Sequence, residues 1–161
     1  MNRMFKYAAI LLLLSVSCTK KLEDPGATAT VAMSNEWWVD LALTDGTDLL
    51  GGDHILFSTY NTSQNVADSL WLDDLGNGYQ FKCKVLANPA DLTFTSDSAV
   101  DDYHNVRVHI EKGKIFPNGG HGKSTGSIVD SIYMEAVFSD DPTTTYVISG
   151  VARSRWAQDD Y

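Results

Sequence analysis

The sequence is poor in cysteine and in positive charge. Its 161 residues include two cysteines, Cys18 and Cys83, and 12 Lys and Arg against 21 Asp and Glu, a formal net charge of −9. Nucleic-acid binding depends on clustered Lys and Arg that neutralise phosphates. An acidic surface likewise disfavours electrostatic docking on anionic lipid. We therefore expect no nucleic-acid partner, and any membrane contact must come from something other than surface charge.

One uninterrupted apolar run, Ala8–Leu14, lies near the start of the chain. Arg3 and Lys6 precede it, and three small residues, 15–17, follow it. This is the pattern of a secretory signal, and it is too short to span a membrane as a mature helix. Cys18 stands directly after the cleavage site, where bacterial lipoproteins carry their acylated cysteine. We predict a lipoprotein signal peptide over residues 1–17, the alternative being an ordinary secretory signal with an incidental cysteine.

Acylation at Cys18 has three consequences for the rest of the chain. Removing residues 1–17 also removes Arg3 and Lys6 but no acid, which takes the net charge from −9 to −11. Cys83 is left without a disulfide partner, so the folded domain must depend on its core. Residues 18–34 are expected to form the acylated start and a flexible tether. We expect a lipid-anchored protein of the cell envelope, at the outer membrane, with its periplasmic or surface side left open.

Residues 35–161 have the pattern of an all-β domain. Short runs of strand-forming residues alternate with turn signals, and outside the signal no segment keeps helical apolar spacing over three turns. The clearest alternation places Tyr79, Phe81, Cys83 and Val85 on one face. We predict a single antiparallel barrel of roughly eight strands, with a β-sandwich as the alternative. The expected strands are 37–43, 54–60, 70–72, 79–85, 92–94, 106–110, 128–138 and 145–155.

One segment imitates two catalytic motifs. Gly122–Gly126 fits the G-x-S-x-G pattern of a nucleophile elbow and, through Gly122-Lys123-Ser124, part of a phosphate-binding loop. Both chemistries require a helix after the loop, and the nucleophile requires a later histidine. No helix is predicted there, and no histidine follows His121. We interpret the segment as a hairpin loop and predict no catalytic residue.

His109 and Glu111 share one strand face and could supply two metal ligands. A third ligand is not evident, and zinc sites in proteins use three or four. A solvated strand surface is the better interpretation. We predict no metal site and no cofactor.

A tryptophan near the start of the domain and two arginines near its end suggest how the barrel closes. In an up-and-down barrel the first and last strands are neighbours, so Arg153 or Arg155 can cover the ring of Trp37. This arrangement resembles that of the lipocalins and the wider calycin group. Their Gly-x-Trp triplet is Asn35-Glu36-Trp37 in this sequence.

The chain from about Asn35 to Trp156 also resembles a family of small Gram-negative lipoproteins described as lipid-binding putative hydrolases. The resemblance implies a calycin-like barrel and the binding of a lipid or another small apolar ligand. Hydrolase activity is implied by the family's description alone. The segments that carry the resemblance are 35–39, 60–62, 68–74, 112–114, 130–133 and 138–142.

Two classes of function follow. The first is a membrane-anchored barrel that holds a lipid or other small apolar ligand in its interior. The second is a non-catalytic accessory or structural lipoprotein that binds an envelope protein or glycan on its outer face. An eight-stranded barrel can hold one small ligand or be filled by its own side chains, and we expect a modest pocket. The expected lining residues are Trp37, Tyr60, Trp71, Phe81, Tyr133 and Phe138.

Replacing Cys18 with Ala is expected to release the protein from membranes into the soluble fraction, because the acyl chains would be lost. Membrane fractionation and metabolic labelling with palmitate measure this. Palmitate incorporation that persists in the Cys18→Ala variant would show that the lipid is attached elsewhere.

Overall fold

The computed structural model describes residues 26–161. The predicted signal peptide, Cys18 and the first part of the predicted tether lie outside these residues. Among the described residues, no helix has both the length and the apolar character needed to cross a membrane.

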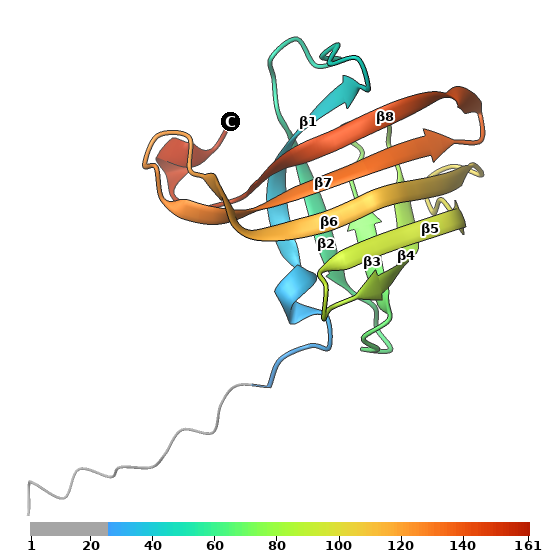
Figure 1. The fold of residues 1–161 in the computed structure, drawn as a ribbon, viewed down its shortest axis with the longest axis horizontal. Coiled ribbons are helices and arrows are strands. Elements are labelled where there is room, and N and C mark those ends of the chain that lie inside the picture. The colour runs from blue at the N-terminus through green and yellow to red at the C-terminus, as the bar shows by residue number, and fades with distance from the viewer. Residues whose placement is uncertain (1–25) are drawn as a thin grey trace, which may run out of the picture.

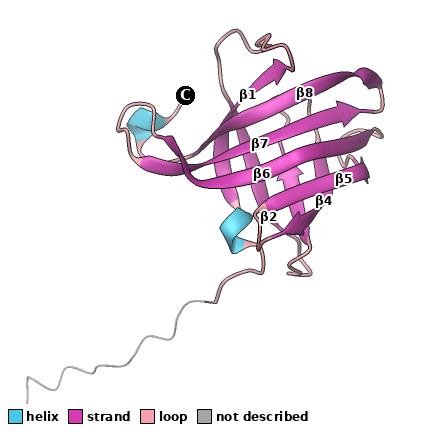
Figure 2. Cartoon of the chain, in the orientation of Figure 1, coloured by secondary structure: helices cyan, strands magenta, loops and turns pink. Residues whose placement is uncertain are grey.

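Eight antiparallel strands form a closed barrel in which each strand pairs with its neighbours in sequence and β8 returns to β1 (Figures 1 and 2). The predicted barrel is confirmed, and the sandwich alternative is not. Two short 3₁₀ helices, η1 (Val31–Met33) and η2 (Ala157–Asp159), flank the strands. The strands are β1 (Asn35–Leu43), β2 (Ile55–Asn61), β3 (Ser69–Asp73), β4 (Lys82–Asn88), β5 (Thr93–Val100), β6 (Arg107–His121), β7 (Ile128–Phe138) and β8 (Asp141–Ala152).

Up-and-down connectivity sorts the loops between two ends of the barrel. Segment η1 lies where β1 begins, at the end that also carries the loops 62–68 and 89–92. We call this the η1 end. The loops 44–54, 74–81, 101–106 and 139–140 lie at the opposite end.

The barrel closes where β1 pairs with β8, and a small residue there makes room for large ones. Trp37 is paired with Ala152, and Val39 with Gly150. A Cβ atom at Gly150 would overlap the carbonyl oxygen of Trp38 and lie 2.6 Å from the Cα atom of Val39. Glycine therefore lets the first and last strands approach each other.

Large side chains fill the interior. Twenty hydrophobic residues form one buried cluster, and the inward residues alternate along each strand as the pleat requires. This packing favours a filled barrel over the expected interior pocket. The largest fully buried side chains include Trp37, Phe57, Phe81, Phe94, Phe138 and Met33.

A buried carboxylate delays the start of β4. Asp74, 1% exposed, accepts hydrogen bonds from the amides of Gly76, Gly78, Gln80 and Phe81. These bonds fold residues 74–81 into a loop, so the strand expected from Tyr79 begins at Lys82. The predicted alternation still holds inside the barrel, where Phe81, Cys83 and Val85 are all buried.

The arginine expected over Trp37 lies instead over Trp38. The guanidinium carbon of Arg153 is 5.9 Å from the centre of the Trp38 ring. Arg153 also pairs with Glu36 at 3.2 Å and with Asp160 at 2.7 Å, and Arg155 pairs with Glu36 at 3.2 Å. Trp37 points inward and is 1% exposed, which leaves its outward neighbour Trp38 for the arginine.

Replacing Gly150 with Ala is expected to lower the free energy of unfolding by about 1–3 kcal/mol, because the added methyl group forces β1 and β8 apart. The unfolding midpoint should fall by roughly 2–4 °C for each kcal/mol lost. Thr143→Ala, at an exposed position of the same strand, is the control. Equal midpoints for the two variants would contradict the close approach.

Candidate functional site

The barrel wall has an opening between β4 and β5. The two strands are paired at Leu86 and Thr95, and the next contact is the isolated bridge between Cys83 and Asp101. Two residues of β4, 84 and 85, thus face five residues of the other strand, 96–100. The excess length bends β5 away from β4 and leaves a gap in the ladder.

The composition of β5 explains why the gap is not filled by side chains. Residues 95–99 read Thr-Ser-Asp-Ser-Ala and supply no large apolar group. Ser96 points inward, is 7% exposed, and donates its hydroxyl hydrogen bond to the Val108 carbonyl at 2.8 Å. Two register shifts between β5 and β6 allow this bend.

The carboxylate of Asp101 joins the strands again beyond the opening. It is buried and accepts hydrogen bonds from the amides of Lys82, at 2.8 Å, and His104, at 2.6 Å. The opening is therefore bounded at both ends, by the ladder at Leu86 and by Asp101.

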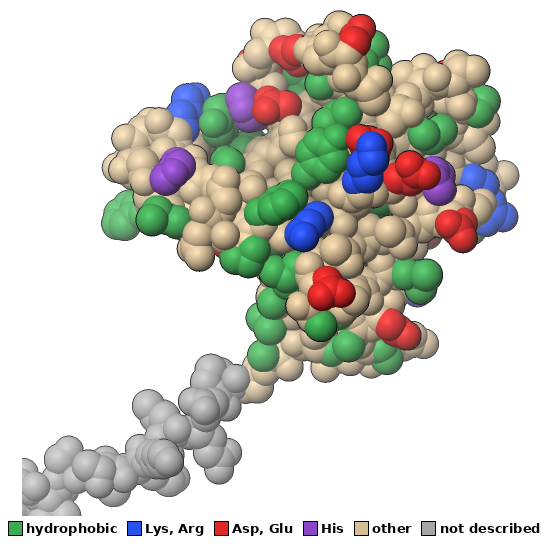
Figure 3. Space-filling view, in the orientation of Figure 1, with side chains coloured by type: hydrophobic (Ala, Val, Ile, Leu, Met, Phe, Trp, Pro, Cys, Tyr) green, Lys and Arg blue, Asp and Glu red, His purple; other side chains and the backbone are tan. Residues whose placement is uncertain are grey.

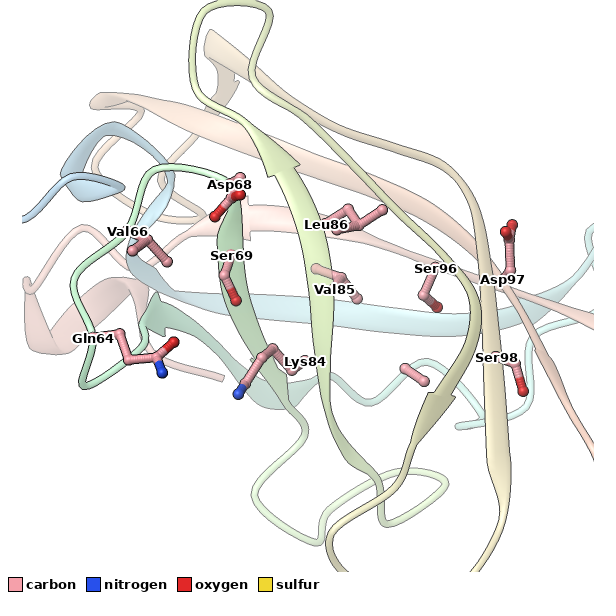
Figure 4. A pocket seen from close by; sticks show the side chains of 11 residues that line it. Gln64, Val66, Asp68, Ser69, Lys84, Val85, Leu86, Ser96, Asp97 and Ser98 are labelled. Carbon is pink, nitrogen blue, oxygen red and sulfur yellow. The ribbon is translucent and has the colours of Figure 1, made fainter.

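A groove of about 520 Å³ lies over the opening on the outer side of the barrel. Figure 4 shows its lining side chains on three segments, the 62–68 loop with the start of β3, then β4, then β5. Leu86 is 68% exposed, more than any other large apolar side chain among the described residues. Buried Val85 lies beneath the groove, and Val66 and Ala99 add apolar surface on either side. The volume falls in the range of small-molecule sites.

Charges of both signs line the groove. Its charged side chains are Lys84, Asp68 and Asp97. The Lys84 amine lies 5.1 Å from the centre of the Trp71 ring, and Lys84 has no ion pair among residues 26–161. The groove thus combines apolar surface with a cation available to an anionic group.

Three of the six aromatic residues predicted to line a pocket lie inside the core. Trp37, Phe81 and Phe138 are each at most 1% exposed. The Trp37 indole nitrogen donates to the Thr59 hydroxyl at 2.9 Å, and Phe138 stacks on Tyr79 with ring centres 3.6 Å apart. These rings are packed against other side chains, so they occupy the interior and do not line the groove.

The other three lie on the outer face. Tyr60 donates a hydrogen bond to Asp73 at 2.7 Å, Trp71 lies under Lys82 and Lys84, and Tyr133 donates to Glu135 at 2.8 Å. Inward and outward residues alternate along a strand, and each of the three has a buried residue directly before it, namely Thr59, Leu70 and Ile132, so each points outward. The structure does not bring the six together. The alternation of inward and outward residues along each strand is the sequence signal that distinguishes the three buried aromatic residues from the three outward ones.

The G-x-S-x-G segment holds a carboxylate of the same chain. Asp159 of η2 accepts the amides of Ser124 and Thr125 at 2.8 Å each, together with the hydroxyls of Thr125 and Ser154. A Cβ atom at Gly122 would overlap the Asp159 carboxylate, which explains this glycine. Burial alone would raise the pKa of Asp159, but these hydrogen bonds hold it well below its usual range. The segment is a loop between β6 and β7, as the sequence predicts.

His109 and Glu111 form a pair on the outer face, with 2.9 Å between His Nε2 and the carboxylate. The pKa of His109 is raised, mainly by this hydrogen bond. Among residues 26–161, no group of three or more His, Cys, Asp or Glu side chains is arranged to hold a metal ion.

Cys83 is a free thiol inside the barrel next to the opening. It is fully buried, and burial, followed by the nearby Asp101, raises its pKa to about 12. A thiol of this kind is inert. Sequence reasoning missed the groove residues Val66, Lys84 and Leu86, because they line an opening that is created by the register between β4 and β5.

Comparison with known proteins identifies one family. The sequence matches the model of a family described as "Lipid-binding putative hydrolase" over residues 22–157. No curated protein matches the chain. Among solved structures, a protein of unknown function from Bacteroides ovatus is similar, with 14% sequence identity and a TM-score of 0.49. The alignment covers 80% of this chain and 43% of that one, so this chain spans less than half of its length.

Replacing Asp159 with Asn is expected to loosen residues 122–126, since an amide cannot accept the same set of hydrogen bonds. Hydrogen exchange at the Ser124 and Thr125 amides should accelerate. Because its pKa is lowered on folding, Asp159 stabilises the fold above the carboxyl's unfolded pKa of about 3.9, and that contribution is lost as pH falls. The stability difference between parent and variant should therefore shrink in acid, and a pH-independent difference would contradict this.

Proposed function

The chain belongs to the family described as "Lipid-binding putative hydrolase", and we propose that it is a membrane-anchored lipoprotein that binds a lipid or another small apolar ligand. The proposed site is the groove between β4 and β5. This differs from the interior site expected from the sequence, because the interior is filled by large side chains.

The observation that carries the proposal is the exposed Leu86 over a gap in the barrel wall. Covering an exposed leucine with an apolar group is worth about 1.5–3 kcal/mol. An acyl chain laid along the opening would cover Leu86 and contact Val66, Val85 and Ala99. Residues 84–85 and 96–100 have no ladder contacts with each other, so a ligand there breaks no strand pairing.

Lys84 gives the groove a polar anchor for one end of a ligand. Its amine lies over the face of the Trp71 ring, and the side chain lines the groove. A carboxylate or phosphate at this position would pair with the amine at the edge of the apolar surface. This arrangement suits an amphipathic molecule with one anionic group.

The membrane attachment rests on Cys18 and the residues before it. Two or three acyl chains on this cysteine would hold the protein at a membrane of the cell envelope, the outer membrane in this proposal. The described domain would then be held close to a source of lipid. The proposal covers binding and not hydrolysis, because the G-x-S-x-G segment joins β6 directly to β7 and lacks the helix that a nucleophile elbow requires.

The alternative, a partner on the outer face, is favoured by the outward position of Tyr60 and Trp71. They pair across β2 and β3. Half-buried aromatic rings with polar neighbours are common in interfaces. Trp71→Ala should then weaken partner binding and leave the groove's apolar residues in place.

The test is titration of a fluorescent fatty acid into a chain that begins at Thr19 and so keeps every described residue. Leu86→Asp is expected to weaken binding about tenfold or more, because it removes apolar contact and adds a repelling charge. Leu75→Asp, 43% exposed at the opposite end, is the matched control.

Lys84→Gln should weaken binding of the fatty acid but not of the fatty alcohol of equal length. Saturable binding that both Leu86→Asp and Lys84→Gln leave unchanged would place the site elsewhere. No saturable binding by the parent chain would contradict the proposed function.

A further inference from the structure

Three exposed apolar side chains lie on neighbouring segments at the η1 end. Val31 is 54% exposed, Val66 39% and Leu86 68%. They come from segments that touch, because the Ala29 amide donates to the Asn65 side chain at 2.8 Å and the Ala87 amide donates to the Asp68 carbonyl at 3.0 Å. We call these three residues the apolar edge. Leu86 belongs both to this edge and to the groove.

The sequence length before the described residues limits how far the barrel can be from Cys18. Eight residue steps separate Cys18 from Gly26. At about 3.3–3.6 Å per step, this segment reaches about 29 Å at most. The described chain then enters the barrel at η1, and Figure 3 shows hydrophobic side chains beside the point where the chain becomes grey. The opposite end is separated from the point where the chain enters the barrel by the length of β1.

Charge at the η1 end fits a neutral surface better than an anionic one. The segments 26–34, 62–68 and 89–92 contain two acids, Asp68 and Asp91, and no Lys or Arg. Acids next to an apolar edge are repelled by anionic lipid and tolerated by zwitterionic headgroups.

We propose that the η1 end rests on the bilayer to which Cys18 is attached, with Val31, Val66 and Leu86 in contact with zwitterionic lipid. The groove between β4 and β5 then opens at the membrane surface. A lipid can pass from the bilayer into the groove along Leu86 without crossing water. This inference rests on the proposed function, since it takes Cys18 as the point of attachment.

The experiment uses the full acylated chain in phosphatidylcholine vesicles that contain a small fraction of spin-labelled lipid. Single cysteines are introduced by Val66→Cys, Leu86→Cys and the control Leu49→Cys, each labelled with an environment-sensitive dye. Leu49 is 42% exposed in the 44–54 loop at the opposite end. Cys83 is fully buried and does not compete for the dye. We expect severalfold stronger quenching at positions 66 and 86 than at position 49.

Two controls separate this inference from the proposed function. The mass of the purified protein reports acylation, and flotation with vesicles reports attachment. An acylated, vesicle-bound chain with equal or weaker quenching at 66 and 86 than at 49 overturns the orientation and leaves the anchored lipid-binding protein standing. A chain that carries no acyl group and does not float overturns both.

Discussion

The Trp37 indole closes the interior of the barrel under η1. Its N–H donates to the Thr59 hydroxyl, which in turn donates to the carbonyl of Met33 in η1. Both Trp37 and Met33 are buried. Burying an indole requires a partner for its N–H, and this relay supplies one while it ties η1 to β1 and β2. The end of the barrel nearest the start of the chain is therefore sealed by packed side chains.

A sealed and filled interior determines where a ligand can bind. Phe57, Phe81 and Phe138 occupy the volume that an interior ligand would need, and their rings pack against one another. The barrel wall lacks β4–β5 pairing and large side chains where β5 has only small residues, at 96–99. The groove at that point is a result of strand pairing, since two residues of β4 span the distance that five residues of β5 also span. Fold and candidate site are thus linked through the register of one strand pair.

The sequence contained enough information for the barrel but not for the groove. Alternation along Phe81, Cys83 and Val85 identified inward residues correctly, because the pleat is a local property. The sequence does not predict that β4 begins only at Lys82, because the four hydrogen bonds to Asp74 that delay it are specific to the folded loop. Residue type alone suggests that Tyr60, Trp71 and Tyr133 line a pocket, but the alternation along their strands turns them to the outer face. The groove depends on a register mismatch between strands, which no local pattern in the sequence reports.

The gap between β4 and β5 also gives a closed barrel two short free edges. Backbone groups of residues 84–85 and 96–100 have no ladder partner across the gap, and unpaired edges can recruit strands from other molecules. Lys84 on one side and Asp97 on the other place a charge on each edge. Such charges are how natural sheets avoid edge-to-edge aggregation. The same two side chains that border the groove therefore help to keep copies of the protein from joining into a continuous sheet.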